Sequence, residues 1–240
     1  MRSQGRKYIF IIMQLILYGA FLTMDILESN IPLSNKIKFA VVVLCFIYAI
    51  NIGLKNRSRE HRFLIYALAF TVVSDMLILL SDFYLYGVMT FILAQQLYGM
   101  RITELNKREL DTISPKSLHR DFAIRLLYQG TFVFLLGILL WLANVNIDAL
   151  LAVSIFYFIS ICTNVLRILK LSVKHYDRKD IMYFAIGMVL FLLCDINVGL
   201  FNLSGFLPIS SAYEVVYNIS SILMWTFYAP SQVFIALSSD

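Results

Sequence analysis

Eight long apolar runs follow one another along this chain, separated by short polar stretches. A helix that crosses the roughly 30 Å hydrocarbon layer of a bilayer needs about 20 mostly apolar residues. The predicted spans are residues 8–24, 37–54, 63–80, 83–102, 122–143, 147–169, 181–201 and 215–237. Only Ser81-Asp82 separates the third span from the fourth, so a tight helical hairpin is expected there. The pattern predicts one all-α domain, residues 1–240, that forms a polytopic membrane helix bundle of about eight transmembrane helices.

The composition supports a membrane protein. Of the 240 residues, 60% are hydrophobic and 15% are charged, and the mean hydropathy is +0.78. A soluble domain has roughly 45–50% apolar and about 25% charged residues, so this chain lacks the polar residues to cover a water-facing surface. The cysteines (Cys45, Cys162 and Cys194) lie far apart inside apolar runs, so we expect small buried side chains there and no disulfide framework.

The positions of the basic residues predict the orientation. All Lys and Arg residues except Lys36 and Lys38 fall on one side of the predicted bundle. The positive-inside rule then places both termini in the cytoplasm, with the first run kept as a span and not removed as a signal peptide. We expect an integral protein of the bacterial plasma membrane that binds no nucleic acid, because the net charge of +5 is spread over short connections. No oligomeric state is predicted.

Histidine placement argues against a buried metal site. All three histidines (His61, His119 and His175) fall in predicted cytoplasmic connections. A zinc site inside the bundle would need imidazole or thiolate ligands at membrane depth. We therefore expect no metal and no cofactor.

Two acids lie at membrane depth, Asp75 in the third span and Asp195 in the seventh. An ionisable group in the bilayer costs at least a few kcal/mol, so it normally faces the bundle interior and marks a site or a pathway. The segments around them are similar, VVSDMLILL and LLCDINVGL. Each is followed by a span with a glutamine after a small residue, Ala94-Gln95 and Ser231-Gln232. The repeat suggests two related helix pairs that each contribute an acid.

Asp75 lies 13 residues after Arg62 (75 − 62) and Asp195 lies 16 residues after Lys179 (195 − 179), so helix rise predicts that both are about 20 Å from the cytoplasmic boundary. The alternative is that each Asp is a structural hydrogen-bond acceptor between helices.

Three segments resemble the YhhN family, the lysoplasmalogenases. ALAFTVVSDMLILLSDFYLYGVMTFILAQQLYGMRI (67–102) resembles its first Asp block, GMVLFLLCDINVGLFNL (187–203) its second, and FYAPSQVFIALSS (227–239) its C-terminal ending. The resemblance covers roughly residues 35–239. It implies hydrolysis of the vinyl-ether bond of lysoplasmalogen, a lysophospholipid, to a fatty aldehyde and glycerophosphoethanolamine or glycerophosphocholine.

The resemblance also implies site residues. The catalytic acids of the family map onto Asp75 and Asp195. The implied substrate-binding positions are Lys36, Ser74, Gln95, Tyr98, Asn202, Tyr228 and Gln232. This chain departs from the family where Ser74 replaces a glycine and Gln95 a histidine, where Asn202 is displaced by one residue, and where no proline follows Lys36.

These observations favour an intramembrane hydrolase with paired-Asp acid/base chemistry. One carboxyl group would protonate the alkene and the other would be ionised, as in glycosidases, which pass through a similar cation. Asp195 is favoured as the acid because its neighbours are mostly apolar, whereas Ser74 is expected to hydrogen-bond an ionised Asp75. Lys36 and Lys38 are candidates to contact the lipid phosphate. The alternatives are a proton-coupled transporter and a non-catalytic lipid-binding membrane protein.

Overall fold

The computed structural model describes residues 2–53, 58–108, 115–143, 147–205 and 213–240. Within these ranges the chain is helical and contains no strand, which confirms the all-α prediction. The helices are α1 (Arg2–Ile26), α2 (Ile31–Gly53), α3 (Arg59–Leu79), α4 (Tyr84–Arg108), α5 (Pro115–Leu142), α6 (Ala149–Lys174), α7 (Lys179–Phe201), the short 3-10 helix η1 (Leu203–Gly205) and α8 (Tyr213–Leu237).

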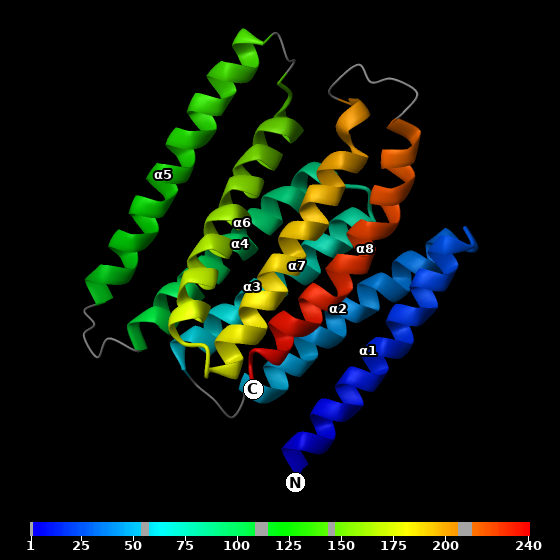
Figure 1. Ribbon diagram of the computed structural model, residues 1–240, viewed down its shortest axis with the longest axis vertical. Coiled ribbons are helices and arrows are strands. Elements are labelled where there is room, and N and C mark those ends of the chain that lie inside the picture. Colours follow the sequence, from blue (N-terminus) through cyan, green and yellow to red (C-terminus); the bar gives the residue numbers. More distant parts are fainter. Residues whose placement is uncertain (1, 54–57, 109–114, 144–146, 206–212) are drawn as a thin grey trace.

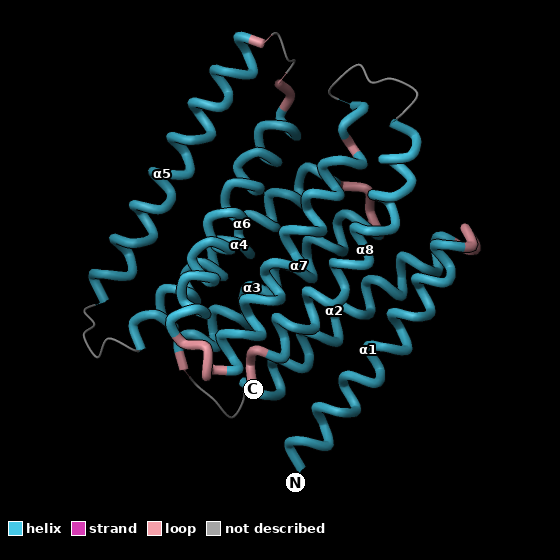
Figure 2. Tube along the Cα trace, in the orientation of Figure 1, coloured by secondary structure: helices cyan, strands magenta, loops and turns pink. Residues whose placement is uncertain are grey.

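The α-helices run up and down beside one another, and the described loops between them are short (Figure 2). Both chain termini lie at the same end of the bundle (Figure 1). Seven helices are long and apolar enough to cross a membrane, and α4 is the exception among the described helices. It carries Gln95, Gln96 and Arg101, which are all buried. Because these polar groups face protein and not lipid, α4 can cross the membrane alongside the other seven helices.

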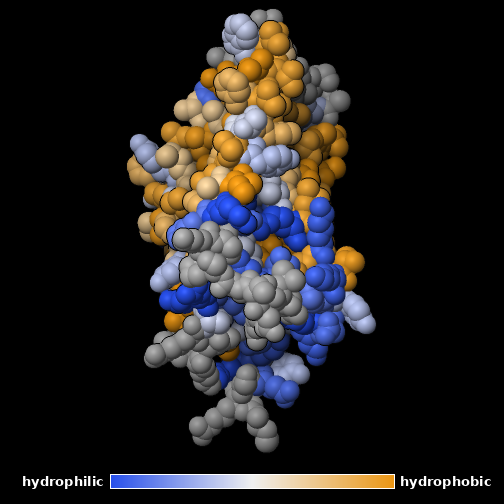
Figure 3. Space-filling view, turned by 90° about the vertical axis from the view of Figure 1, so that its left-hand side faces the viewer, coloured by the Kyte–Doolittle hydropathy of each residue, from blue (hydrophilic) through white to orange (hydrophobic). Residues whose placement is uncertain are grey.

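The outer surface of the bundle is apolar. Large side chains such as Ile9 and Ile16 of α1 and Leu127, Phe134 and Trp141 of α5 are exposed. Seen from the α5 side, the upper part of the molecule is hydrophobic, and hydrophilic atoms gather toward the lower end (Figure 3). An apolar surface of this extent suits contact with lipid, so the described part of the chain has the surface of an integral membrane protein.

The hairpin between α3 and α4 is as tight as its sequence predicts. Asp82 adopts a left-handed conformation with φ of 55°, which Asp tolerates better than most residues. The Phe83 amide then donates to the Leu77 carbonyl (2.8 Å), which closes the end of α3. The sharp turn places α3 and α4 in contact along their lengths, and they form one of the two most extensive helix interfaces.

The other extensive interface joins α7 and α8. Gly187 makes it close, because a Cβ at this position would lie 2.9 Å from the Ser231 carbonyl oxygen and 2.7 Å from Ile235. Pro230 lies inside α8 and cannot donate to the carbonyl of Thr226 one turn earlier. The Tyr18 hydroxyl of α1 donates to that carbonyl instead (3.4 Å), so a neighbouring helix satisfies the group that the proline frees.

The histidine placement differs from the sequence prediction. His61 and His119 lie within α3 and α5, because both helices begin before their apolar runs, and His175 caps the end of α6. His61 is buried, with its Nε2 3.1 Å from the Ala49 carbonyl of α2. It therefore ties α2 to α3 near their ends.

Candidate functional site

Asp75 and Asp195 lie equally far along their helices, which agrees with the equal depth that the sequence predicts. Asp75 is 16 residues after Arg59, the first residue of α3, and Asp195 is 16 residues after Lys179, the first residue of α7 (75 − 59 and 195 − 179). At 1.5 Å per residue, each acid is about 24 Å along its helix. Both helices start at the end of the bundle where the termini lie (Figure 1), so the two carboxyl groups share one level.

Each acid is hydrogen-bonded to a tyrosine from another helix. The Tyr228 hydroxyl of α8 donates to Oδ2 of Asp75 (2.6 Å), and the Tyr157 hydroxyl of α6 donates to Oδ2 of Asp195 (2.7 Å). Asp75 is 3% exposed, and Asp195 is partly buried. The site therefore consists of two Asp–Tyr pairs and not of two isolated carboxyl groups.

An aromatic cluster, consisting of Phe91, Tyr157, Phe191 and Tyr228, joins the two pairs. The Phe91 ring of α4 lies 5.7 Å from the Tyr157 ring and 6.5 Å from the Tyr228 ring, measured between centroids. Phe191 of α7 contacts both Phe91 (5.8 Å) and Tyr228 (5.4 Å). Both Asp–Tyr pairs thus border one apolar, aromatic region that lies between α4, α6, α7 and α8.

Gln95 and Tyr98 of α4 are fully buried near this cluster. Asn164 of α6 donates to the Gln95 side-chain oxygen (3.0 Å) and backbone oxygen (2.7 Å). The Tyr98 ring packs on Phe184 with centroids 5.7 Å apart. The Gln95 side-chain nitrogen and the Tyr98 hydroxyl are fully buried and make no close hydrogen bond to the described residues. Tyr157 nevertheless lies near Gln95, and Thr71 lies near Tyr98.

Three further predicted site residues make no hydrogen bond to the carboxyl groups. The Ser74 hydroxyl donates to the Gly87 carbonyl (2.6 Å), so the expectation that it hydrogen-bonds Asp75 is wrong. A serine has a single hydroxyl proton, and here it links α3 to α4. Asn202 is exposed and donates to the Val198 carbonyl at the end of α7. Gln232 is buried and contacts the neighbouring Ser231 hydroxyl (3.2 Å).

The two lysines at the start of α2 differ from each other. Lys36 is exposed. Lys38 is buried, forms an ion pair with Asp25 of α1 (2.8 Å), and lies 4.4 Å from the centre of the Trp225 ring. The structure therefore does not bring Lys36 to the aspartates, and it gives Lys38 a carboxylate partner of its own.

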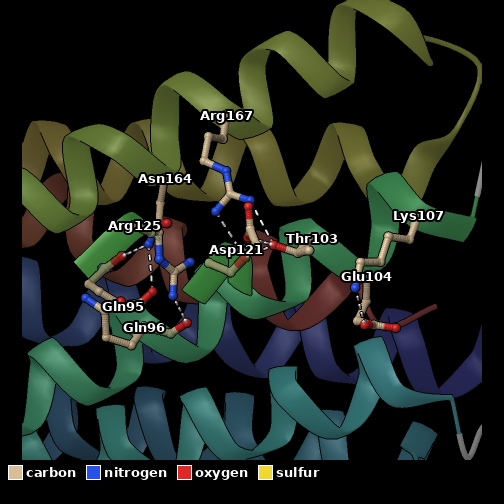
Figure 4. Close-up of polar contacts among 10 residues, drawn as sticks. Gln95, Gln96, Thr103, Glu104, Lys107, Asp121, Arg125, Asn164 and Arg167 are labelled. Carbon is tan, nitrogen blue, oxygen red and sulfur yellow. Dashed lines mark hydrogen bonds and ion pairs between the residues drawn. The ribbon is translucent and has the colours of Figure 1, made fainter. Parts of the chain in front are cut away.

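A second buried polar region, between α4, α5 and α6, was not foreseen from the sequence (Figure 4). Arg125 of α5 donates to the Gln96 backbone oxygen (2.9 Å), and Gln96 donates to Gln129 (3.0 Å). Beside it, Arg167 of α6 pairs with Asp121 of α5 (3.1 Å). The sequence pattern treats both arginines as orientation signals, although both lie inside predicted spans, Arg125 in 122–143 and Arg167 in 147–169. The described residues contain no group of three or more His, Cys, Asp or Glu side chains that could hold a metal ion.

The fold, the apolar surface and the two Asp–Tyr pairs define a polytopic helical membrane protein with an acidic site inside its bundle. Comparison with known families narrows this class. The model of the YhhN family matches residues 33–239, and the chain belongs to this family. No curated protein and no solved structure matches the chain.

Proposed function

We propose that this protein is an intramembrane hydrolase that cleaves the vinyl-ether bond of lysoplasmalogen. The observation that carries the proposal is the pair of carboxyl groups at one depth, each bonded to a tyrosine of the same aromatic cluster. Family membership over most of the chain supports the same reaction class. The products would be a fatty aldehyde and glycerophosphoethanolamine or glycerophosphocholine.

The reaction needs one carboxyl group that is protonated and one that is ionised. The first transfers its proton to the alkene carbon that is not bonded to the ether oxygen, which leaves an oxocarbenium ion. The second takes a proton from water as the water oxygen bonds to the cationic carbon, giving a hemiacetal. Collapse of the hemiacetal breaks the bond from this carbon to the glycerol oxygen. The second carboxyl group returns its proton to that oxygen and the first takes the hemiacetal hydroxyl proton, which releases the aldehyde and restores both carboxyl groups. Two carboxyl groups with these roles suffice for glycosidases.

The neighbours of Asp75 and Asp195 fit these roles. Each tyrosine occupies Oδ2 of its aspartate, and no described residue bonds the other oxygen, which is left for proton transfer. Aromatic faces attract cations at close range, so Phe91 and Phe191 would stabilise the oxocarbenium ion. The same rings limit water near the alkene, which suits a reaction that consumes one water molecule.

Replacement of the two acids tests the proposal. In purified protein, Asp75→Asn and Asp195→Asn should each lower aldehyde release from lysoplasmalogen by several powers of ten, roughly as for other catalytic groups that act as one unit. For the same reason the double variant should lose little more. Asp148→Asn is the matched control, because Asp148 caps α6 at the surface and asparagine caps equally well.

Near-normal turnover in either single variant, with the control also active, would contradict the paired-acid mechanism. Wild-type protein that binds lysoplasmalogen without releasing aldehyde would favour a lipid-binding protein or a transporter.

A further inference from the structure

Arg125 is a buried cation with too few partners. It is 6% exposed, and its guanidinium makes one hydrogen bond, from Nη2 to the Gln96 backbone oxygen. Its Nε and Nη1 have no hydrogen-bond partner among the described residues, and no carboxylate of those residues forms an ion pair with it. A buried charge without a partner is costly, so binding of an anion at this position would be favourable.

Within the described part of the chain, the groups around Arg125 include buried donors without a partner and also two such acceptors, the side-chain oxygens of Gln96 and Asn164. We call the set the arginine cluster; its members are Gln95, Gln96, Gly99, Arg125, Gln129 and Asn164. The side-chain nitrogens of Gln95 and Gln129 have no partner among the described residues. Figure 4 shows Arg125 among Gln95, Gln96 and Asn164, with Arg167 and Asp121 beside them. Since the single carboxylate of Asp121 is already shared by Arg167 and Thr103, the region keeps an excess of one positive charge.

Gly99 makes room for the guanidinium. A Cβ at this position of α4 would overlap the Arg125 guanidinium and would lie 2.8 Å from the Asn164 side-chain oxygen. The arginine therefore lies directly against the backbone of α4. In this position it is buried inside the bundle.

We propose that the arginine cluster binds the phosphate of a lysophospholipid head group. A phosphodiester carries one negative charge, which balances the excess, and its oxygens match the fork of guanidinium donors. This inference rests on the proposed function, because it places the head group of the same substrate.

The distance from the arginine cluster to the carboxyl groups matches the length of a glycerol backbone. Tyr157, which bonds Asp195, and Asn164 of the arginine cluster are seven residues apart on α6 (164 − 157), or about 10 Å along the helix. In lysoplasmalogen three carbons and one oxygen separate the ether oxygen from phosphorus, a separation of the same order. The head group then points toward the end of the bundle where the termini lie, and the aliphatic chain points away from it.

This placement differs from a phosphate contact with Lys36 or Lys38. Both lysines lie at the opposite end of α2, Lys36 exposed and Lys38 paired with Asp25. The two placements orient the lipid in opposite directions, so one set of variants separates them.

Binding of a lipid that cannot react tests the inference without relying on catalysis. The saturated alkyl-ether analogue of lysophosphatidylcholine has the same head group but no alkene to protonate. Purified wild-type protein should bind it more tightly than the alkylglycerol of equal chain length, which has no phosphate. Arg125→Gln should weaken binding of the analogue by about tenfold or more, as for loss of one partner of a buried charge pair, and leave alkylglycerol binding unchanged.

Arg120→Gln is the matched control, because Arg120 is an exposed arginine of the same helix. It should bind the analogue as the wild type does. Gly99→Ala, which displaces the guanidinium without removing its charge, should weaken binding as Arg125→Gln does, and it serves as the second variant if Arg125→Gln does not fold. Inorganic phosphate and a short-chain glycerophosphodiester are added as competitors. If inorganic phosphate displaces the analogue at a lower concentration than the glycerophosphodiester does, free phosphate is the preferred ligand of the same site.

Unchanged affinity of the analogue in both Arg125→Gln and Gly99→Ala would overturn the inference, and so would a loss confined to Lys36→Ala. Aldehyde release by the wild type and its loss in the Asp75 and Asp195 variants report on the proposed function separately. The binding assays therefore test the head-group site, and the aldehyde assays test the reaction, so one proposal can fail without the other.

Discussion

At the residue scale, the partners of the two aspartates differ in a way that the repeated sequence does not suggest. Tyr228 lies four residues before Gln232 on α8, and Phe91 lies four residues before Gln95 on α4. The repeat would therefore place a phenylalanine where a hydroxyl is needed for Asp195. Tyr157 of α6 supplies that hydroxyl instead. The two halves of the bundle thus reach the same Asp–Tyr pairing by different helices.

The tyrosines give a first prediction. Tyr157→Phe and Tyr228→Phe each remove a hydrogen bond to a carboxyl group, which is worth about 1.5–3 kcal/mol, so turnover should fall by roughly 10-fold to 100-fold. Initial rates of aldehyde release at saturating lipid measure this. Tyr66→Phe is the control, because Tyr66 is exposed on α3 and should retain full activity. Equal rates in all three variants would show that the hydroxyls only pack the bundle.

At the element scale, the site depends on how closely two helix pairs pack. The α3–α4 pair carries Asp75 and Phe91, and the α7–α8 pair carries Asp195 and Tyr228, so the Asp75–Tyr228 bond crosses from one pair to the other. Gly187 sets the spacing of α7 and α8 against the Ser231 carbonyl. Because Ser231 is three residues from Tyr228 on the same helix, a change in spacing moves the tyrosine as well.

Gly187→Ala should therefore destabilise the protein and lower turnover. The added methyl group meets backbone atoms of α8, which cannot move aside as a flexible side chain can. The cost of overpacking is then toward the upper end of about 1–3 kcal/mol, more than the roughly 1 kcal/mol gained from the higher helix propensity of alanine. The melting temperature in detergent and the rate of aldehyde release both report on it. Gly137→Ala is the matched control, because nothing lies within 4 Å of a Cβ there, and it should be neutral or stabilising. A Gly187→Ala variant that melts no lower than this control would contradict the close packing.

At the scale of the whole molecule, the arrangement of the helices and the distribution of charge predict the same orientation in the membrane. The termini lie at one end of the bundle, and the basic residues of the sequence, apart from Lys36 and Lys38, belong to that end of the predicted topology. Hydrophilic atoms gather there on the α5 side (Figure 3). The positive-inside rule then predicts that this end faces the cytoplasm.

Cysteine labelling in intact cells tests the orientation. Ser81→Cys and Asp148→Cys should react with a membrane-impermeant thiol reagent added outside, and Lys174→Cys should react only after the membrane is opened. All three positions are exposed, whereas Lys107 is buried and unsuited to labelling. The parent protein, with Cys45 and Cys194 buried, gives the background. Labelling of Lys174→Cys in sealed cells would show that the protein has the opposite orientation.

Sequence reasoning located the two carboxyl groups but not their surroundings. Asp75 and Asp195 stand out because charge at membrane depth is costly, and their equal depth follows from helix rise alone. Tyr157 could not be singled out in the same way, because tyrosine is common at helix contacts and membrane interfaces. Ser74 adjoins Asp75 in sequence, yet successive residues of a helix point in different directions, and its hydroxyl faces α4. Arg125 was counted with the basic residues of a connection, since the sequence does not show that α5 buries it.

The sequence by itself determined the class of protein, the all-helical architecture, the positions of the helices and the depth of both acids. Each of these follows from local physical chemistry: the length of apolar runs, the rise of a helix, and the cost of charge in hydrocarbon. Only the tertiary structure decided that Tyr228 and Tyr157 bond the acids, that Phe91 lies between the pairs, and that Arg125 lies against Gly99 with unused donors. These contacts join helices far apart in the chain, and they depend on the rotation of each helix about its axis, which packing against all of its neighbours determines together.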